Sequence, residues 1–147
     1  MSFEDGVRAG YLAAIIEGEG SISLIRGIHK RRGGKANVFY TAQVQLNNNS
    51  YELLEAVKDW IGGGHIAKVS KDCRCYYFCL RKQIKLFRCL MDIEPHLLSD
   101  RKRRLCELLM EFCGLRLEKL ESGEKGKYAY GEREVEIWQE MRDLNAS

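Results

Sequence analysis

The sequence of 147 residues contains a single proline, Pro95, and no stretch rich in serine and proline that would mark a linker. It also lacks any apolar run near the roughly eighteen residues of a transmembrane helix, so we expect no membrane contact. Met1 to Asp5 is acidic where a signal peptide would be basic and then apolar, which favours an intracellular protein, cytoplasmic or organellar, over a secreted one. Apolar residues make up 45% and charged residues 31%, so we expect one folded domain spanning residues 1–147.

The sequence has little net charge, because 24 Lys and Arg residues face 21 Asp and Glu residues, a formal +3. The basic side chains are nevertheless clustered. Residues 26–35 carry five of them with one histidine and no acid, and residues 101–104 are all basic. Acids gather instead between Glu132 and Asp143. Basic clusters of this kind are typical of surfaces that contact phosphate groups.

The six cysteines, at positions 73, 75, 79, 89, 106 and 113, lack the C-x-x-C pairs of structural zinc sites. The chain is also too long, and too rich in apolar residues, to need a disulfide scaffold. We therefore interpret the cysteines as buried free thiols. The cytosol of a thermophile is the exception in which disulfides could form.

Hydrophobic periodicity predicts the element order α-β-β-α-β-β-α-α-α. Two strand hairpins separated by a helix favour an α+β fold, an antiparallel sheet with helices on one face. Ser50 is the expected N-cap of the second helix, and Gly62 to Gly64 ends it. The expected helices are 5–18, 51–61, 82–91, 99–113 and 131–143, and the expected strands are 21–29, 37–47, 65–70 and 73–81.

Two acids, Glu17 and Glu19, stand at the C-terminal end of the first expected helix. That end of a helix carries partial negative charge, so acids there are mildly destabilising unless a cation lies nearby. A divalent metal would satisfy both the carboxylates and the helix end. From charge placement alone, two solvated surface acids remain the simpler explanation.

The segment from Leu12 to Gly20, LAAIIEGEG, resembles the LAGLIDADG motif of homing endonucleases, in the variant that ends in Gly-Glu-Gly. The predicted element order, the stretch from Trp60 to Gly64, and Pro95 followed by Leu97 and a basic helix start are also similar to that family. The resemblance covers about residues 6–113 and leaves 115–147 as a helical C-terminal extension.

The resemblance implies a saddle-shaped antiparallel sheet and a site-specific endonuclease for double-stranded DNA, typically encoded within an intron or intein. Such enzymes cut a long, pseudo-palindromic target with Mg²⁺, for which Mn²⁺ is expected to substitute. On this basis Glu19 is the metal ligand and a catalytic residue, whereas Glu17 supports the helix end.

Two further catalytic residues are implied by the same resemblance. A polar residue near the end of the second strand corresponds to Asn47 or Gln45, and a basic residue near the later helix start corresponds to Lys102, with Arg101 as its competitor. Asp100 stands where a count from the proline could place the base, which departs from the family pattern. Contact of the basic run with the DNA backbone explains these residues equally well.

The motif occurs once, because the helical segment from Leu105 to Gly114 has no acid directly before its glycine. A single motif implies a homodimer. The small residues Gly6, Gly10 and Ala13 would let two copies of the first helix approach closely about a twofold axis. Two Glu19 carboxylates would then lie side by side, where they repel unless metal stands between them.

The polar face of the sheet is expected to read DNA, because a two-stranded ribbon fits the major groove and its alternate side chains reach base edges. The basic hairpin tip is expected to contact phosphates. Any one of these residues taken alone could be an ordinary solvated strand residue. The expected DNA-binding residues are Ser23, Ile25, His29, Asn37, Phe39, Thr41 and Gln43 on the first hairpin, Arg31, Arg32 and Lys35 at its tip, and Lys68, Lys71, Arg74 and Arg81 on the second.

Two alternatives use the same scaffold: a maturase that binds intron RNA, and a DNA-binding regulator without catalytic activity. Glu19 favours the enzyme, because a protein that only binds nucleic acid does not need an acid against the helix dipole.

Overall fold

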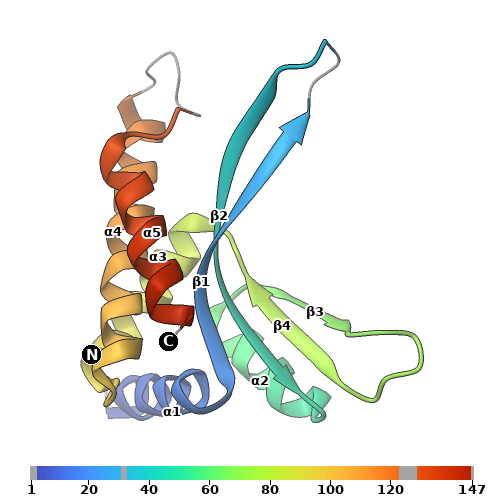
Figure 1. Ribbon diagram of the computed structural model, residues 1–147. Coiled ribbons are helices and arrows are strands. Elements are labelled where there is room, and N and C mark those ends of the chain that lie inside the picture. Colours follow the sequence, from blue (N-terminus) through green and yellow to red (C-terminus); the bar gives the residue numbers. More distant parts are fainter. Residues whose placement is uncertain (1–2, 31–32, 123–128, 147) are drawn as a thin grey trace.

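The computed structural model describes residues 3–30, 33–122 and 129–146. Its element order confirms the predicted α-β-β-α-β-β-α core followed by two more helices (Figure 1). The elements are α1 (Phe3–Glu19), β1 (Gly20–Lys30), β2 (Ala36–Asn48), α2 (Tyr51–Ile61), β3 (His65–Lys68), β4 (Tyr76–Leu80), α3 (Gln83–Ile93), the 3-10 turn η1 (Glu94–His96), α4 (Asp100–Ser122) and α5 (Glu132–Ala146).

The four strands form one antiparallel sheet in the order β1-β2-β4-β3. β1 and β2 pair over their whole length, from Gly20 opposite Leu46 to Lys30 opposite Ala36. β4 pairs only with the last part of β2, from Val44 to Asn48. The far half of the β1–β2 hairpin therefore extends beyond the rest of the sheet as a long, twisted arm (Figure 1).

The apolar side chains of the strands point to one face, and the helices cover that face. Ile22, Val44 and Phe78 are fully buried there. α5 also reaches this core, because its side chains Ile137 and Met141 are buried. The α+β architecture with helices on one face is thus confirmed, and the opposite face of the sheet is left open.

Several boundaries differ from the periodicity, most of all in α4 and in the hairpin of β3 and β4. α4 extends to Ser122 although residue 113 was its expected end, because Gly114 does not adopt the left-handed conformation with which a glycine commonly ends a helix. Gly114 keeps a negative φ, and a Cβ on it would lie 3.9 Å from the ring of Phe87 on α3. β3 and β4 are shorter than expected because residues 69–75 form a turn closed by the Val69 N–H on the Cys75 carbonyl.

The caps of α2 confirm their prediction. The Ser50 side chain accepts a hydrogen bond from the Leu53 N–H at 3.2 Å, and Gly62 ends the helix at φ 79° with its N–H on the Lys58 carbonyl. Gly64 has φ 105°, and a Cβ on it would lie 2.1 Å from the ring of the buried Phe78. Only glycine fits this position, so the glycine run sets the path from α2 into β3.

All six cysteines are free thiols, as expected. Burial raises the pKa of Cys89, Cys106 and Cys113 to about 12, so these thiols are chemically quiet. Cys73 and Cys75 are only partly buried, which differs from the prediction, because their turn lies at the edge of the sheet.

Across the described part of the chain, no helix is long and apolar enough to cross a membrane.

Candidate active site and nucleic-acid interface

Glu19 is the last residue of α1, and its side chain is exposed at the point where the chain enters β1. Its Oε2 accepts a hydrogen bond from Asn48 Nδ2 at 2.8 Å. The Asn48 Oδ1 accepts the N–H of Ser50 at 2.8 Å, which fixes the direction of that amide. No described residue forms a salt bridge with Glu19. The carboxylate is therefore held in place but keeps an unneutralised charge.

Glu17 has a different role from Glu19, because residues two apart lie on nearly opposite sides of a helix. Its carboxylate accepts the backbone N–H groups of Leu98 and Ser99, at 2.9 Å and 2.7 Å. These hydrogen bonds from Ser99 and Leu98 hold the pKa of Glu17 below its usual value. Glu17 thus ties the end of α1 to the segment that precedes α4.

Lys102 lies in the first turn of α4, and its Nζ donates to the Gly20 carbonyl at 2.5 Å. Ser99 caps this turn, since its Oγ accepts the Lys102 N–H at 3.2 Å. Burial, and then the nearby Arg101, lower the pKa of Lys102. The structure therefore brings Lys102 to the residue that follows Glu19, whereas Arg101 is exposed.

Asn48 contacts Glu19 but was not among the expected site residues. The predicted strand ended at Asn47, and the alternation of β2 turns Asn48 toward the other face of the sheet. The run of three asparagines from Asn47 to Asn49 was the only signal in the sequence, and it also fits an ordinary turn.

At the end of α1, the described part of the chain offers one carboxylate, that of Glu19, to a metal. Within the described ranges, no three His, Cys, Asp or Glu side chains converge on a point. Mg²⁺ typically keeps several waters and takes one or two carboxylates together with phosphate oxygens of a substrate. An exposed Glu19 fits that donor set, provided that phosphate and a second carboxylate come from outside the chain.

The open face of the sheet carries the predicted polar residues at neighbouring positions. The register pairs Ser23 with Gln43, Ile25 with Thr41, and His29 with Asn37. The ring of Phe39 occupies the space above Gly27 of β1, where a Cβ would come within 2.2 Å of it. It also contacts the His29 ring edge-on, with ring centroids 6.3 Å apart. These residues form one continuous surface along the hairpin arm.

A chain of hydrogen bonds runs along this face toward the end of β2. Arg81 Nε donates to Gln43 Oε1 at 3.0 Å, and Gln43 Nε2 donates to Gln45 Oε1 at 3.4 Å. Gln45 Nε2 in turn donates to Asn47 Oδ1 at 3.1 Å. Gln43 is only 5% exposed, so it is less available to a ligand than its position in the strand suggested.

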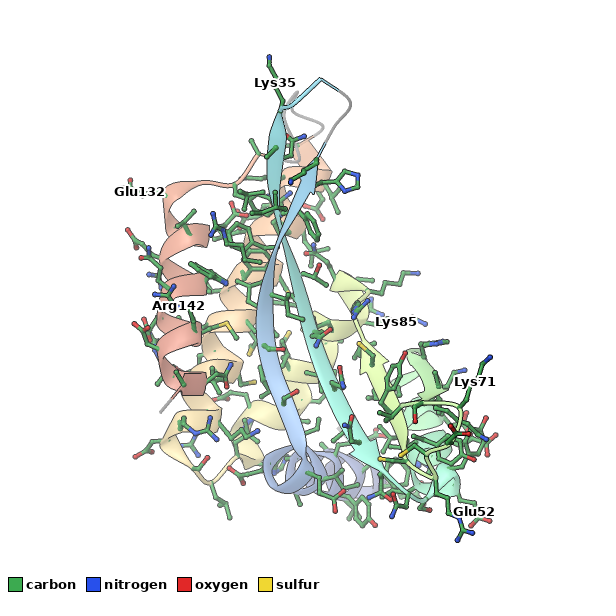
Figure 2. All side chains as sticks on the ribbon, turned by 45° about the vertical axis from the view of Figure 1, so that its right-hand side comes forward. Lys35, Glu52, Lys71, Lys85, Glu132 and Arg142 are labelled. Atoms are coloured by element: carbon green, nitrogen blue, oxygen red, sulfur yellow. The ribbon has the colours of Figure 1, made fainter. Side chains whose placement is uncertain are left out.

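The expected phosphate contacts fall in separate places. Arg31 and Arg32 lie outside the described residues, while Lys35 stands at the far end of the arm (Figure 2). Lys71 and Arg74 are exposed in the β3–β4 turn. Lys68 shares its side of the sheet with Ile66 and Phe78, so its side chain leaves the strand toward the helix layer rather than the open face.

The predicted dimer residues divide between two environments. A Cβ on Gly6 or Gly10 would meet no atom within 4 Å, so both face open space. Ala13 is 1% exposed and packs into the core of its own chain. This differs from the prediction, because the buried stripe of α1 is wider than the small-residue spacing indicated. The residues at the centre of the open face of α1 are Val7, Tyr11, Ala14 and Gly18.

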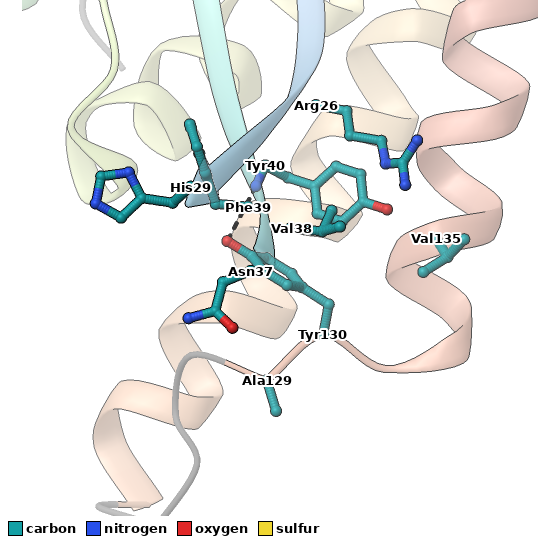
Figure 3. Close-up of a pocket in the computed structure, with 9 residues that line it drawn as sticks. All are labelled: Arg26, His29, Asn37, Val38, Phe39, Tyr40, Ala129, Tyr130 and Val135. Atoms are coloured by element: carbon teal, nitrogen blue, oxygen red, sulfur yellow. Dashed lines mark hydrogen bonds between the residues drawn. The ribbon is translucent and has the colours of Figure 1, made fainter. Parts of the chain in front are cut away.

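The C-terminal extension packs against the β1–β2 arm, and the two together form a groove of about 980 Å³ (Figure 3). The Tyr40 N–H, on the edge of β2 that no strand covers, donates to the Tyr130 hydroxyl at 3.1 Å. No sequence pattern could have indicated this contact between residues ninety positions apart. The groove is lined by Arg26, His29, Asn37, Val38, Phe39, Tyr40, Ala129, Tyr130 and Val135.

No family model and no curated protein matches the sequence, but solved structures match the fold. The homing endonuclease I-CvuI, in complex with the I-CreI target in the presence of Mg, aligns with a TM-score of 0.62 at 17% identity over 98% of both chains. The group I intron-encoded homing endonuclease I-CeuI, complexed with DNA, aligns with a TM-score of 0.68 at 16% identity, over 99% of this chain and 70% of that one. The LAGLIDADG meganuclease I-AabMI, bound to uncleaved DNA, aligns with a TM-score of 0.60 at 21% identity, over 95% of this chain and 44% of that one. The chain therefore has the fold of the LAGLIDADG homing endonucleases.

Proposed function

We propose that this protein is a site-specific endonuclease that hydrolyses both strands of duplex DNA as a homodimer, using Mg²⁺ or Mn²⁺. One observation carries the proposal: Glu19 ends α1, and Lys102 donates to the carbonyl of the next residue, Gly20, beside the end of the polar sheet face. The Glu19 carboxylate has no salt-bridge partner among the described residues, and a buried ammonium group is held at the residue that follows it, an arrangement with no evident structural purpose.

In this proposal Glu19 holds the divalent ion, and Asn48 keeps its carboxylate in position through the 2.8 Å hydrogen bond. When bound, such an ion supplies a water of lowered pKa and positive charge near the scissile phosphate. The carbonyl groups at the C-terminal end of α1 add partial negative charge that favours a cation there.

Lys102 is assigned to the phosphate rather than to the metal. Its ammonium is anchored on the Gly20 carbonyl, so it is positioned before the reaction starts and can stabilise the charge that develops on the phosphate oxygens. Because its pKa is lowered, it can also give up a proton more readily than an exposed lysine. Asn47 or Gln45 supplies the remaining polar contact.

Recognition of a long target is assigned to the sheet. Side chains on the open face of the arm contact base edges, and the basic residues of the two turns contact phosphates. Binding by several phosphate contacts weakens steeply as salt rises. I-CeuI and I-AabMI, whose structures contain bound DNA, have the same fold, which supports DNA as the ligand.

The dimer completes the site. One chain brings one Glu19, and the open face of α1, which includes Gly10, offers a surface on which a second α1 can pack closely. I-AabMI, of whose chain this one covers 44%, supports the idea that two such units are needed. An intron-encoded origin and residues 115–147 as part of the same domain belong to this proposal.

The test starts with duplexes selected for binding from a randomised library, incubated with the protein and Mg²⁺. We expect cleavage of both strands, reduced about a hundredfold or more in Glu19→Gln, because the metal ligand is lost. Glu52→Gln is the matched control, since Glu52 is an exposed acid at the start of α2, and it should cut like the wild type (Figure 2).

Other outcomes would overturn parts of the proposal. Binding without cleavage under Mg²⁺ and Mn²⁺ would indicate the non-catalytic regulator. Tight binding to intron RNA in preference to duplex DNA would indicate the maturase. A native mass of one 17.0 kDa chain, both free and on DNA, would contradict the homodimer.

A further inference from the structure

The hydrogen-bonded chain on the open face has a direction, which Arg81 imposes. A guanidinium group only donates, so Gln43 must turn its oxygen toward Arg81 Nε. The thiol of Cys79 donates to the same oxygen at 3.5 Å. Amide oxygen and nitrogen have nearly the same shape, so hydrogen-bonding partners alone decide which way the group lies. Because Gln43 is 5% exposed, water cannot easily replace these partners.

The orientation of the Gln43 amide fixes the orientations of the Gln45 and Asn47 amides. Its Nε2 faces Gln45, which must present Oε1 to accept, and Gln45 therefore offers its own Nε2 to Asn47. Asn47 accepts through Oδ1, which leaves Nδ2 as the group available for a ligand. No hydrogen bond within the described residues engages the Asn47 Nδ2. Reversing one amide would set two donors or two acceptors against each other, so the chain reverses as a whole or not at all.

Asn47 directly precedes Asn48, whose amide holds the Glu19 carboxylate. The amide chain thus ends on the open face, one residue before Asn48, which points to the other face and holds the proposed metal ligand Glu19. A donor at this place can stabilise negative charge on a phosphate oxygen, whereas an acceptor would instead hold a hydrogen of water. The direction of the chain therefore decides which of two roles Asn47 can take.

We propose that Arg81 is a positioning residue that acts through Gln43 and Gln45 to make Asn47 a hydrogen-bond donor at the cleavage site. The inference rests on the proposed nuclease function. It gives Arg81 a task beyond contact with DNA, and it assigns Asn47 to the phosphate rather than to the attacking water.

A double-mutant cycle tests this coupling, with single-turnover cleavage measured at saturating selected duplex and Mg²⁺. We expect Arg81→Met to lower the rate constant about tenfold in the wild type and to have no further effect when Asn47→Ala is already present. Additive losses would overturn the proposal, because they would mean that Arg81 acts on DNA directly. Lys82→Met removes a positive charge one residue away and should leave the rate within about twofold.

A second measurement does not depend on cleavage. In the ¹⁵N–¹H spectrum, the side-chain NH₂ groups of Gln43, Gln45 and Asn47 should all shift in Arg81→Met while the backbone resonances of the core stay in place. An unchanged Asn47 NH₂ would contradict the relay. If the wild type cuts no DNA with any metal, the proposed function fails, and the NH₂ spectra still decide whether Arg81 directs Asn47.

Discussion

Glu17, at the end of α1, and Ser99, just before α4, are joined by a 2.7 Å hydrogen bond from the Ser99 N–H to the Glu17 carboxylate. The Leu98 N–H donates to the same group. Ser99 also caps the first turn of α4, which carries Lys102. Glu17 therefore positions Lys102 indirectly, through Ser99 and this turn.

We expect Glu17→Gln to lower the free energy of unfolding by about 1 kcal/mol at pH 7, since two charge-assisted hydrogen bonds at a partly exposed site become neutral ones. Urea denaturation measures this. Glu118→Gln changes an exposed acid on α4 and should shift stability by less than about 0.5 kcal/mol.

The contribution of Glu17 should also depend on pH. Its pKa is lowered in the folded protein, so its stabilisation is fully present above the ordinary value of 4.5 and is lost as pH falls through the lowered value. The difference between wild type and Glu17→Gln should therefore disappear in acid. A difference that persists at the lowest pH would show that charge is not the cause.

The cleavage rate should fall as pH rises through the pKa of Lys102, which lies below its ordinary value of 10.5 because of burial. In the proposed mechanism only the ammonium form stabilises the phosphate. Lys102→Arg should extend activity to higher pH, and Lys102→Met should lose about a hundredfold at every pH. Identical pH profiles for wild type and Lys102→Arg would exclude this lysine as the titrating group.

The same lysine provides a stability test without DNA. Its folded pKa is lowered, so the unfolded chain binds more protons between that value and 10.5. The free energy of unfolding of the wild type, relative to Lys102→Met, should rise with pH across this window. Denaturation curves collected over a pH series measure this trend, and a fall with pH would contradict the assigned shift.

Glu134 on α5 joins the C-terminal extension to α4 through two ion pairs, a buried one with Arg116 and a second with Lys119. It accepts from Arg116 Nη1 at 2.9 Å and from Lys119 Nζ at 2.6 Å, and it is 2% exposed. Burial raises the pKa of Glu134, but the bonds from Lys119, the Gly131 N–H and Arg116 outweigh this and leave the pKa lowered.

Removing one partner of a buried pair leaves an uncompensated charge, so we expect Glu134→Gln to cost about 3 kcal/mol of unfolding free energy. The same helix pair offers its own control. Arg104 and Glu140 form an exposed ion pair at 2.6 Å, and Glu140→Gln should cost less than about 1 kcal/mol. Equal losses in the two variants would show that burial does not govern these pairs.

Tyr130→Phe should destabilise the β1–β2 arm near Tyr40 locally, without changing the packing of the core. The ring contacts with Tyr40 and Phe112 remain, but the Tyr40 N–H loses its acceptor on the open edge of β2. We expect a stability loss of about 1 kcal/mol. Amide exchange at Tyr40 should become faster while exchange at Val44, which pairs with β4, stays unchanged. Faster exchange at both residues would instead indicate general destabilisation.

Local patterns in the sequence predicted the elements because alternation and helical spacing record which side of each segment is buried. Ala42, Val44 and Leu46 lie in the core as the period of β2 indicated, while Val38, on the same side, is 37% exposed because the arm leaves the core there. The resemblance of the segment from Leu12 to Gly20 to the LAGLIDADG motif likewise implied the fold that the structure has.

The partners of the site residues were decided only by the tertiary structure. Glu17 with Ser99, Lys102 with Gly20, Gln43 with Arg81 and Tyr40 with Tyr130 each join segments far apart in the chain. A sequence records the preference of each residue for helix, strand, burial or water, and that preference is the same for many possible partners. Sheet register and helix packing select one partner, so the sequence by itself determined the scaffold and the candidate acid, and the folded chain decided which groups surround it.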